Sequence, residues 1–354
     1  MLRALDLARL GWGQTAPNPM VGAVVVRDGA VVGEGHHARY GEPHAEVVAL
    51  RAAGDRARGS TVYVSLEPCA HTGKTPPCAD ALIAAGVRRV VAATADPSLI
   101  GRGGLSRLAA AGVQTEVGIE EQAARELNAA FFHAITAARP WVTLKMALSL
   151  DGATTDSRGT KRWITGESSR REVHRLRAGA DAVAVGLGTV LADDPALTVR
   201  VAPAPRVPPA RVVFDRRART PLDSQLVRTA REMPVVVIAE ATECDRARAL
   251  QNAGVQVLAA VSLDDALRQL RQPGRVAPHG VRSLLVEGGA RLAGSLWGEG
   301  LVDRLIIFQA PLVLGAGAAN AFAYAPGVEL ASARRMRIID RRTFDDDVMT
   351  TYAL

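Results

Sequence analysis

Apolar and polar residues in the first part of the chain alternate between the spacing of strands and the spacing of helices. The segments 21–26 (VGAVVV) and 31–35 (VVGEG) flank a turn at 27–29, and this arrangement predicts a β-hairpin. Further strands are predicted at 61–68, 88–94 and 114–117, and helices at 2–12, 44–53, 78–86, 103–112 and 120–138. Strands that alternate with helices indicate a layered α/β unit.

The rest of the chain continues this alternation. Strands are predicted at 141–152, 211–215, 234–240, 255–260 and 303–315, some with the loops that follow them, and 181–200 and 283–300 each contain a strand, a glycine turn and a helix. Helices are predicted at 163–179, with Thr165 as N-cap, and at 262–271. The pattern predicts a mostly parallel sheet with helices on both faces. Because Pro140 stops the preceding helix, we expect two domains, 1–139 and 140–354.

Composition agrees with two globular domains. The chain has 354 residues, of which 48% are hydrophobic and 22% charged, and this balance argues against disorder. We find no apolar run of the roughly 18 residues that a membrane span needs, and the N-terminus does not have the pattern of a signal peptide. Three cysteines are too few for a disulfide framework, so we expect a cytoplasmic protein with no membrane partner.

The net charge of +7 raises the question of nucleic acid. The arginines are scattered, and aromatic residues, which would stack on bases, make up only 4% of the chain, so we expect no nucleic-acid partner. Of the 43 basic residues only Lys74, Lys145 and Lys161 are lysines. A lysine in such a chain is a candidate for a role that needs a compact ammonium group.

One His and two Cys residues in the first domain form a candidate metal site. His44 and Cys78 each open a predicted helix, and Cys69 follows a predicted strand. One nitrogen and two sulfur ligands suit Zn²⁺, and three protein ligands leave the fourth position open for water, which is typical of a catalytic site. Glu46 lies two residues after the ligand His and is a candidate to carry a proton from that water to the ring nitrogen and the leaving ammonia.

Other interpretations of these residues stay open at this point. A single His at a helix start is commonly a cap, a single Cys is commonly a small core residue, and two Cys can form a redox pair. The order HxE, PC and then Cys follows the signature of zinc deaminases, although eight residues instead of two separate Cys69 from Cys78. We expect Cys244 to be a buried residue with no role in metal binding.

Three segments carry a family resemblance. PNPMVGAVVV (17–26), GEPHAEVVAL (41–50) and PCAHTGKTPPC (68–78) resemble the cytidine-deaminase-like domain of the bifunctional riboflavin biosynthesis proteins, which are deaminases and reductases of a phosphoribosylaminopyrimidine. The resemblance implies that His44, Cys69 and Cys78 bind zinc and that Glu46 shuttles the proton. It also implies that Asn18 and Lys74 hold the pyrimidine and the ribose phosphate.

The second half resembles the reductase part of the same family, through TLKMALSLDG, WIT, HRLRAGADAVAVGLGTVLADDPALTVR and LLVEGGARLAGSLW. The implied fold is an N-terminal cytidine-deaminase-like α/β/α domain followed by a C-terminal dihydrofolate-reductase-like α/β domain that uses NADPH. The implied cofactor contacts are Ala147, Trp163, Thr189, Asp193, Gly289, Ala290, Arg291, Leu292, Ala293, Gly294 and Ser295. The implied substrate contacts are Lys145, Lys161, Arg177, Leu197, Arg200 and Glu287.

The resemblance implies deamination of 2,5-diamino-6-ribosylamino-4(3H)-pyrimidinone 5′-phosphate and then NADPH-dependent reduction of its ribosyl group, by a homo-oligomer (dimer or tetramer). Lys145 and Glu287 end two predicted strands, so we expect both to face one cleft and to act as catalytic residues near the sugar carbon. Two other functions remain open: a nucleic-acid-editing deaminase, and an enzyme with one inactive half. Ser98, Ala153 and Arg216 depart from the family pattern, which leaves the loops and cofactor contacts around them open.

Overall fold

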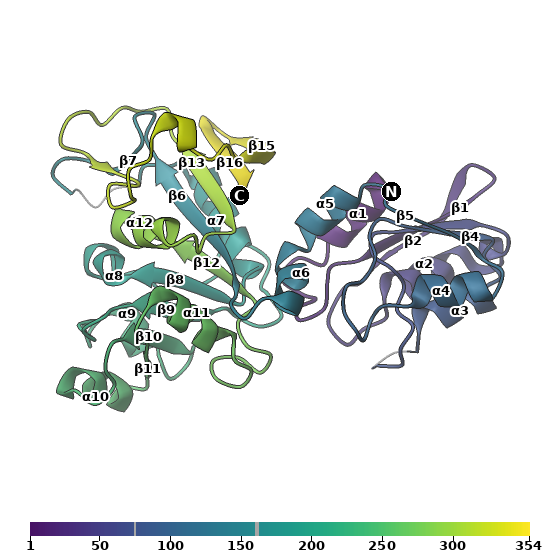
Figure 1. The fold of residues 1–354 in the computed structure, drawn as a ribbon, viewed down its shortest axis with the longest axis horizontal. Helices are drawn as coiled ribbons and strands as arrows, with labels where there is room; N and C mark the ends of the chain where they lie inside the picture. Colours follow the sequence, from purple (N-terminus) through teal and green to yellow (C-terminus); the bar gives the residue numbers. More distant parts are fainter. Residues whose placement is uncertain (74–75, 160–162) are drawn as a thin grey trace. The chain divides into compact units, whose positions relative to one another are not determined.

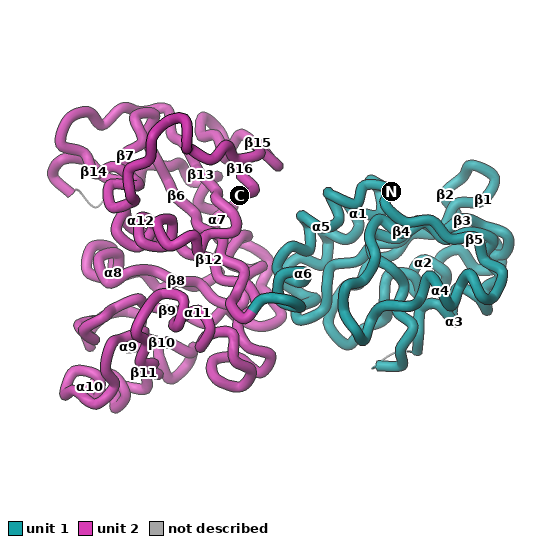
Figure 2. Tube along the Cα trace, viewed as in Figure 1, with its two compact units in different colours: residues 1–137 teal, residues 138–354 magenta. Residues whose placement is uncertain are grey.

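The computed structural model describes residues 1–73, 76–159 and 163–354. The chain divides into two compact units, Met1–Ala137 (unit 1) and Ala138–Leu354 (unit 2), which Figure 2 shows in different colours. The two units are described separately.

The described part of unit 1 is built on a five-stranded sheet (Figure 1) with strand order β2-β1-β3-β4-β5. The strands are β1 (Gly22–Arg27), β2 (Ala30–His36), β3 (Thr61–Val64), β4 (Arg89–Ala92) and β5 (Gln114–Val117). The helices are α1 (Leu2–Arg9), α2 (Ala45–Ala53), α3 (Cys78–Ala84), α4 (Gly104–Ala110), α5 (Glu121–Leu127) and α6 (Ala129–Thr136), with the 3-10 turn η1 (Gly54–Ala57). The predicted hairpin is present, because β1 pairs with β2 in antiparallel fashion.

Helices cover both faces of this sheet. Apolar residues of α2, α3 and α4 pack with one face, and those of α1 and α5 pack with the other. Gly22 shows how closely α1 approaches, since a Cβ at that position would lie 2.0 Å from the carbonyl oxygen of Ala4. The result is the α/β/α arrangement that the family resemblance implies.

The prediction of one long helix at 120–138 is wrong. The chain forms α5 and α6, which are separated at Asn128, whose φ of −109° and ψ of 26° are not helical. The Asn128 side chain explains the break, because its amide donates to the carbonyl of Met20 and accepts from the Met20 N–H. A tertiary hydrogen-bond pair thus outweighs the helical pattern of the sequence.

The described part of unit 2 contains a nine-stranded sheet with the order β11-β10-β9-β8-β12-β6-β13-β16-β15. Its strands are β6 (Trp141–Leu148), β8 (Ala182–Gly186), β9 (Ala210–Phe214), β10 (Val235–Ala239), β11 (Gln256–Ala259), β12 (Ser283–Glu287), β13 (Arg304–Gln309), β15 (Arg337–Phe344) and β16 (Asp347–Ala353). The short strands β7 (Ala153–Thr155) and β14 (Ala319–Asn320) pair separately, and η2 spans Leu330–Ser332. The helices are α7 (Glu167–Ala178), α8 (Leu187–Asp193), α9 (Gln225–Arg228), α10 (Asp245–Asn252), α11 (Leu263–Arg271) and α12 (Ala290–Gly298).

The strands from β11 to β13 are parallel, as predicted, and helices lie on both faces. Apolar residues of α11 and α12 pack against one face, and those of α7, α8, α9 and α10 pack against the other. The antiparallel pairs β13–β16 and β15–β16 complete one edge of the sheet. This C-terminal hairpin is not among the elements expected from the sequence.

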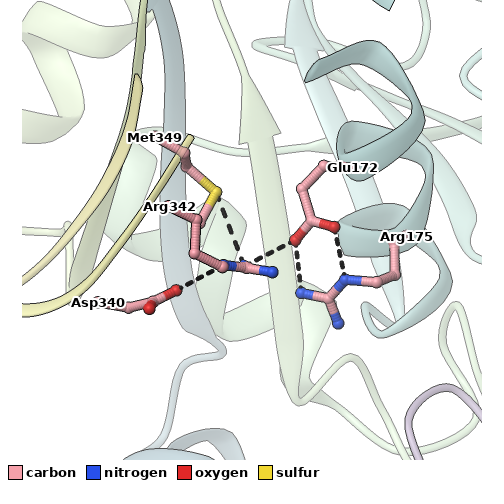
Figure 3. Close-up of polar contacts among 5 residues, drawn as sticks. All are labelled: Glu172, Arg175, Asp340, Arg342 and Met349. Carbon is pink, nitrogen blue, oxygen red and sulfur yellow. Dashed lines mark hydrogen bonds and ion pairs between the residues drawn. The ribbon is translucent and has the colours of Figure 1, made fainter. Parts of the chain in front are cut away.

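The hairpin is bonded to α7. Figure 3 shows Glu172 of α7 between Arg175 of the same helix and Arg342 of β15, with Glu172 Oε1 at 2.8 Å from Arg342 Nη2. Asp347 of β16 accepts hydrogen bonds from the N–H of Gly166 and the hydroxyl of Ser169 at the start of the helix. The predicted N-cap at Thr165 is therefore wrong, because Gly166 is the N-cap residue and Asp347 supplies the acceptor.

Within the described residues, no helix combines the length and the apolar character needed to cross a bilayer.

Candidate functional site

Three potential metal ligands converge in unit 1. His44 is the N-cap residue of α2, Cys78 is the first residue of α3, and Cys69 lies in the loop after β3. His44 Nδ1 lies 3.2 Å from Cys78 Sγ and 3.6 Å from Cys69 Sγ, and the three donor atoms all lie within 4.8 Å of one another. A tetrahedral zinc with bonds of about 2.0 Å to nitrogen and 2.3 Å to sulfur separates such atoms by about 3.5 Å. The three side chains therefore fit a zinc ion that keeps one position for water.

The two sulfur atoms have different surroundings. Hydrogen bonds from the Cys78 side chain, His44 and the Cys78 backbone N–H lower the pKa of the Cys69 thiol to about 4, although burial acts in the opposite direction. The pKa of the Cys78 thiol is raised, because this thiol is hydrogen-bonded to Cys69 and buried. A coordinated cation removes the proton of a thiol, so both sulfurs would bind zinc as thiolates.

Glu46 lies beside these ligands in the first turn of α2, and only 3% of its surface is exposed. Burial raises the pKa of its carboxyl group to about 7. A group with this pKa takes up and releases a proton at neutral pH, which is the requirement for a proton shuttle.

Asn18 is connected to the metal ligands through His37. Asn18 Nδ2 lies 3.2 Å from His37 Nε2, and His37 Nδ1 lies 3.2 Å from the carbonyl oxygen of Pro43. The rings of His37 and His44 meet edge to face with centroids 5.2 Å apart. His37 is not among the site residues expected from the sequence. The one sequence feature that could have pointed to it as a site residue is its position shortly after the predicted hairpin.

A loop next to Cys69 is held by a buried carboxylate. Glu67 accepts hydrogen bonds from three backbone N–H groups, those of Asp96 and Gly103 in this loop and that of Leu105 in the first turn of α4. Ser98, which departs from the family pattern, donates its backbone N–H to Asp96 Oδ1 at 2.8 Å. The loop is therefore bonded both to Glu67, in the segment between β3 and Cys69, and within itself.

The second group of predicted residues lies in unit 2. Lys145 of β6 and Glu287 of β12 are direct partners in the parallel pair of strands, so their side chains emerge on the same face of the sheet. Helix α7 covers this face and contributes Arg177. The two residues lie on one side of the sheet, as expected, but the expected position of Lys145 at a strand end is wrong, because β6 continues to Leu148 and only Glu287 ends its strand.

Arg177 and Glu287 form a mostly buried bidentate ion pair. Arg177 Nε lies 2.5 Å from Glu287 Oε1, and Nη2 lies 2.8 Å from Oε2. Burial alone would raise the pKa of Glu287, but Arg177, and also Lys145, hold it below the ordinary value. Burial lowers the pKa of Lys145, against the attraction of Glu287, and its ammonium lies 5.5 Å from the centre of the Phe308 ring.

The predicted substrate contacts Leu197 and Arg200 lie in the segment that follows α8. The carbonyl oxygen of Thr198, between them, accepts a hydrogen bond of 3.0 Å from Arg177 Nη1. Arg200 is exposed, and its Nη1 donates to the hydroxyl of Thr198 at 3.0 Å. Leu197 is buried among apolar residues of the sheet and its helices.

Two of the predicted cofactor contacts, Thr189 and Gly289, lie close together near the starts of α8 and α12. A Cβ built on Gly289, the N-cap residue of α12, would lie 3.6 Å from Thr189 Oγ1 of α8. Leu292 and Ala293 in the first turn of α12 pack into the core, and a Cβ built on Gly294 would lie 2.7 Å from the backbone of Tyr324. The remaining contacts are distributed as follows: Ala147 follows Lys145 on the same face of β6, Asp193 ends α8, Ala290, Arg291 and Ser295 belong to α12, and Trp163 is exposed, with the Arg170 guanidinium 5.4 Å from its ring centre.

The other expectations have mixed outcomes. Lys74 and Lys161 lie outside the described residues. Ala153 pairs with Asn320 in the small sheet, and Arg216 is exposed and forms an ion pair with Glu240. The expectation of a buried Cys244 is wrong, because this residue is the exposed N-cap of α10. The residues of α10 that pack into the apolar core are Ala247 and Leu250.

Comparisons with known proteins match both units. The family model of the cytidine and deoxycytidylate deaminase zinc-binding region matches residues 1–94, and that of the RibD C-terminal domain matches residues 140–350. The chain is 45% identical over 320 residues to the riboflavin biosynthesis protein RibD of Aquifex aeolicus, which covers 90% of this chain and 87% of the relative. It is 42% identical to RibD of Escherichia coli, over 98% of this chain and 96% of the relative.

A solved structure is similar over the whole chain. It is that of a diaminohydroxyphosphoribosylaminopyrimidine deaminase/5-amino-6-(5-phosphoribosylamino)uracil reductase from Thermotoga maritima, with a TM-score of 0.85 and 32% identity. The alignment covers 100% of this chain and 97% of that chain.

Proposed function

This chain belongs to the RibD family of bifunctional riboflavin biosynthesis enzymes, and from that premise we propose that residues 1–139 are its deaminase domain and residues 140–354 its NADPH-dependent reductase domain. The proposed substrate is 2,5-diamino-6-ribosylamino-4(3H)-pyrimidinone 5′-phosphate. Its ring amino group is removed first, and its ribosyl group is then reduced to ribityl.

The convergence of His44, Cys69 and Cys78 beside the buried Glu46 carries the first half of the proposal. When bound by these three residues, zinc lowers the pKa of a water molecule towards about 7 and so supplies hydroxide at neutral pH. Glu46 would take one proton from the attacking water and deliver it to the ring nitrogen, and would then carry the second proton of that water from the oxygen to the amino group, which leaves as ammonia. Asn18, whose amide is oriented by His37, is the proposed contact for the pyrimidine.

The charge cluster on β6 and β12 carries the second half. NADPH, when bound, supplies the hydride. Lys145 and Glu287 are the proposed catalytic residues near the sugar carbon, and Arg177 fixes the Glu287 carboxylate through two hydrogen bonds. The N-terminus of α12 after Gly289 and the neighbouring Thr189 are the proposed anchors for cofactor phosphate, since N–H groups at a helix start bind anions.

The phosphate of the substrate needs a cation in each domain. In the reductase domain we assign Arg200, because its guanidinium is exposed, whereas that of Arg177 is engaged by Glu287 and Thr198. Lys74 and Lys161 are the further candidates from the sequence. We also propose a homo-oligomer, a dimer or tetramer, that works in the cytoplasm on a small molecule and not on nucleic acid. Free thiols at the metal site suit a reducing compartment.

One assay with the purified zinc-loaded protein tests the proposal. The diaminopyrimidine phosphate is added with and without NADPH, and ammonia release and NADPH absorbance are followed separately. We expect ammonia release without NADPH, and NADPH oxidation that begins only after deamination. The proposal fails if either signal is absent with fresh enzyme. Light scattering of the same sample tests the homo-oligomer separately, and the mass of a single chain would contradict it.

A further inference from the structure

The backbone between α8 and β9 is strained where it carries Leu197 and Arg200. Asp194 and Leu197 have φ values of 41° and 52°, in the left-handed region that side chains other than glycine rarely adopt. Such conformations persist only where surrounding contacts hold them, and they are concentrated at functional sites. Segment 194–200 is therefore fixed by its neighbours.

Residues of two other elements hold the first part of this segment through backbone and side-chain donors. Gln225 of α9 donates its backbone N–H to Asp194 Oδ1 at 2.7 Å and its side-chain amide to the Asp194 carbonyl at 2.5 Å. Arg211 of β9, which is fully buried, donates to the carbonyl of Ala196 at 3.4 Å. These contacts end before Leu197, so the second part needs a separate support.

His174 of α7 supplies that support. Its Nδ1 lies 3.0 Å from the carbonyl oxygen of Thr198 and 3.3 Å from the backbone nitrogen of Arg200. With a hydrogen on Nδ1 the ring donates to Thr198, and with the hydrogen on Nε2 it accepts from the N–H of Arg200, so both neutral tautomers tie the segment to the helix. The pKa of His174 is lowered by burial and by the guanidinium groups of Arg177 and Arg200, while the bond to Thr198 and the charge of Glu287 act in the opposite direction.

The helix that carries His174 is itself fixed. Arg177, one turn further along α7, donates to the same Thr198 carbonyl and holds Glu287. The C-terminal hairpin anchors the opposite side of the helix through Glu172 and Arg342 (Figure 3). One rigid helix therefore sets the positions of both the Glu287 carboxylate and the backbone that presents Arg200.

We propose that His174 is a positioning residue of the reductase, which holds residues 198–200 so that Arg200 presents its guanidinium to the substrate phosphate. This inference rests on the proposed reductase function and adds a residue to it. His174 acts through Arg200 and does not take part in hydride transfer. Its loss should weaken substrate binding in the reductase domain and leave the chemical step, deamination and NADPH binding in place.

The test compares His174→Leu with His174→Asn and with Arg171→Ala, a control on the exposed side of α7. Asn carries its amide nitrogen where Nδ1 lies, so it keeps a bond to Thr198. In the reduction of the deaminated substrate we expect His174→Leu to raise KM about five- to tenfold, the effect of one lost hydrogen bond. The kcat and the KM for NADPH should stay near the parental values, and His174→Asn should recover most of the loss.

Hydrogen exchange of the peptide that covers 194–200 tests the same contact without turnover. Exchange should be faster in His174→Leu than in the parent, His174→Asn and Arg171→Ala. Unchanged exchange and unchanged KM in His174→Leu would overturn the inference. If the parent protein is active in the same assay, the proposed reductase function is not affected by that result. A loss confined to kcat, or equal losses in the Leu and Asn variants, would also overturn it. An inactive parent would instead reject the reductase function, and faster exchange in His174→Leu would still support the contact.

Discussion

The two sites differ in what balances their buried charges. In unit 1, His44, Cys69 and Cys78 bring a nitrogen and two sulfur atoms together next to a buried carboxyl group, an arrangement suited to a bound cation. In unit 2, the chain itself supplies both signs, because Glu287 is held between Arg177 and Lys145. The first site therefore depends on an added ion for its charge balance, whereas the second is organised by the fold.

This difference predicts how each site responds to substitution. A ligand lost from unit 1 removes the ion and with it the chemistry, while the sheet and its helices remain packed. A partner lost from the Arg177–Glu287 ion pair of unit 2 leaves an uncompensated charge in a packed region, so activity and stability change together. Each of the following predictions tests this contrast.

The largest effect is expected from the cysteine ligands. Cys69→Ser and Cys78→Ser should each lose most of the bound zinc, because a hydroxyl group is a much weaker zinc ligand than a thiolate. Ammonia release should fall to background, and reduction of pre-deaminated substrate should continue. Metal analysis and the two assays check this.

Cys244→Ala is the matched control, since Cys244 is exposed on α10 of the other unit. It should keep the zinc content and both activities. A full equivalent of zinc in both ligand variants would mean that the metal binds elsewhere.

Glu46→Gln should separate proton transfer from metal binding. Gln keeps the shape and the hydrogen bonds of Glu but cannot carry a proton, and general acid–base catalysis contributes about 10²–10⁴-fold to rates. We expect zinc content and thermal stability near the parental values and a fall in ammonia release of that order. Deamination at more than half the parental rate would exclude Glu46 as the shuttle.

Lys145→Met and Glu287→Gln test the charge cluster of unit 2, which consists of Lys145, Arg177 and Glu287. Lys145→Met should reduce NADPH oxidation about a hundredfold, as expected for loss of a charged group at the reacting atoms, with little change in Tm. Glu287→Gln should also lower the stability of unit 2, by about 3–5 kcal/mol, because Arg177 then loses its partner. Deamination should persist in both variants. Parental NADPH oxidation in a stable Lys145→Met protein would remove Lys145 from the mechanism.

The smallest effect is expected where the hairpin meets α7. Arg342→Ala removes its contact with Glu172, but the Arg342 side chain is 40% exposed and Glu172 keeps Arg175. We expect a loss of about 1 kcal/mol or less, which corresponds to a few degrees in the Tm of unit 2. Arg216→Ala, in an exposed ion pair with Glu240, is the control and should leave Tm unchanged. A larger loss in the control would show that surface charge, and not the bond to α7, sets the effect.

The zinc site could be predicted from the sequence because its geometry is largely local. Each ligand lies at a predicted helix start or just after a strand, and the ends of such elements meet at one edge of a sheet. The hairpin and most strands of both sheets could be predicted for a similar reason, since their apolar patterns are strong. The β6–β12 register aligns Lys145 with Glu287, although only Glu287 lies at a strand end and Lys145 lies three residues before the end of β6.

The features that could not be predicted depend on contacts between distant segments. The break at Asn128 follows from its bonds to Met20, and the orientation of Asn18 depends on His37. The strand β15 has a weak apolar pattern with charged residues throughout, so nothing local distinguishes it from a loop. The engagement of Arg177 with Glu287 likewise required the packing of α7 on the sheet.

The position of β6 has a consequence for how the molecule forms. This strand is the first of unit 2 in the sequence, yet it lies between β12 and β13, which come near the other end of that unit. In unit 1 the strands follow one another across the sheet almost in sequence order. Proteins with many contacts between distant residues fold more slowly. After dilution from denaturant with zinc present, we therefore expect ammonia release to return before NADPH oxidation, so that the enzyme regains its two reactions in the order in which it uses them.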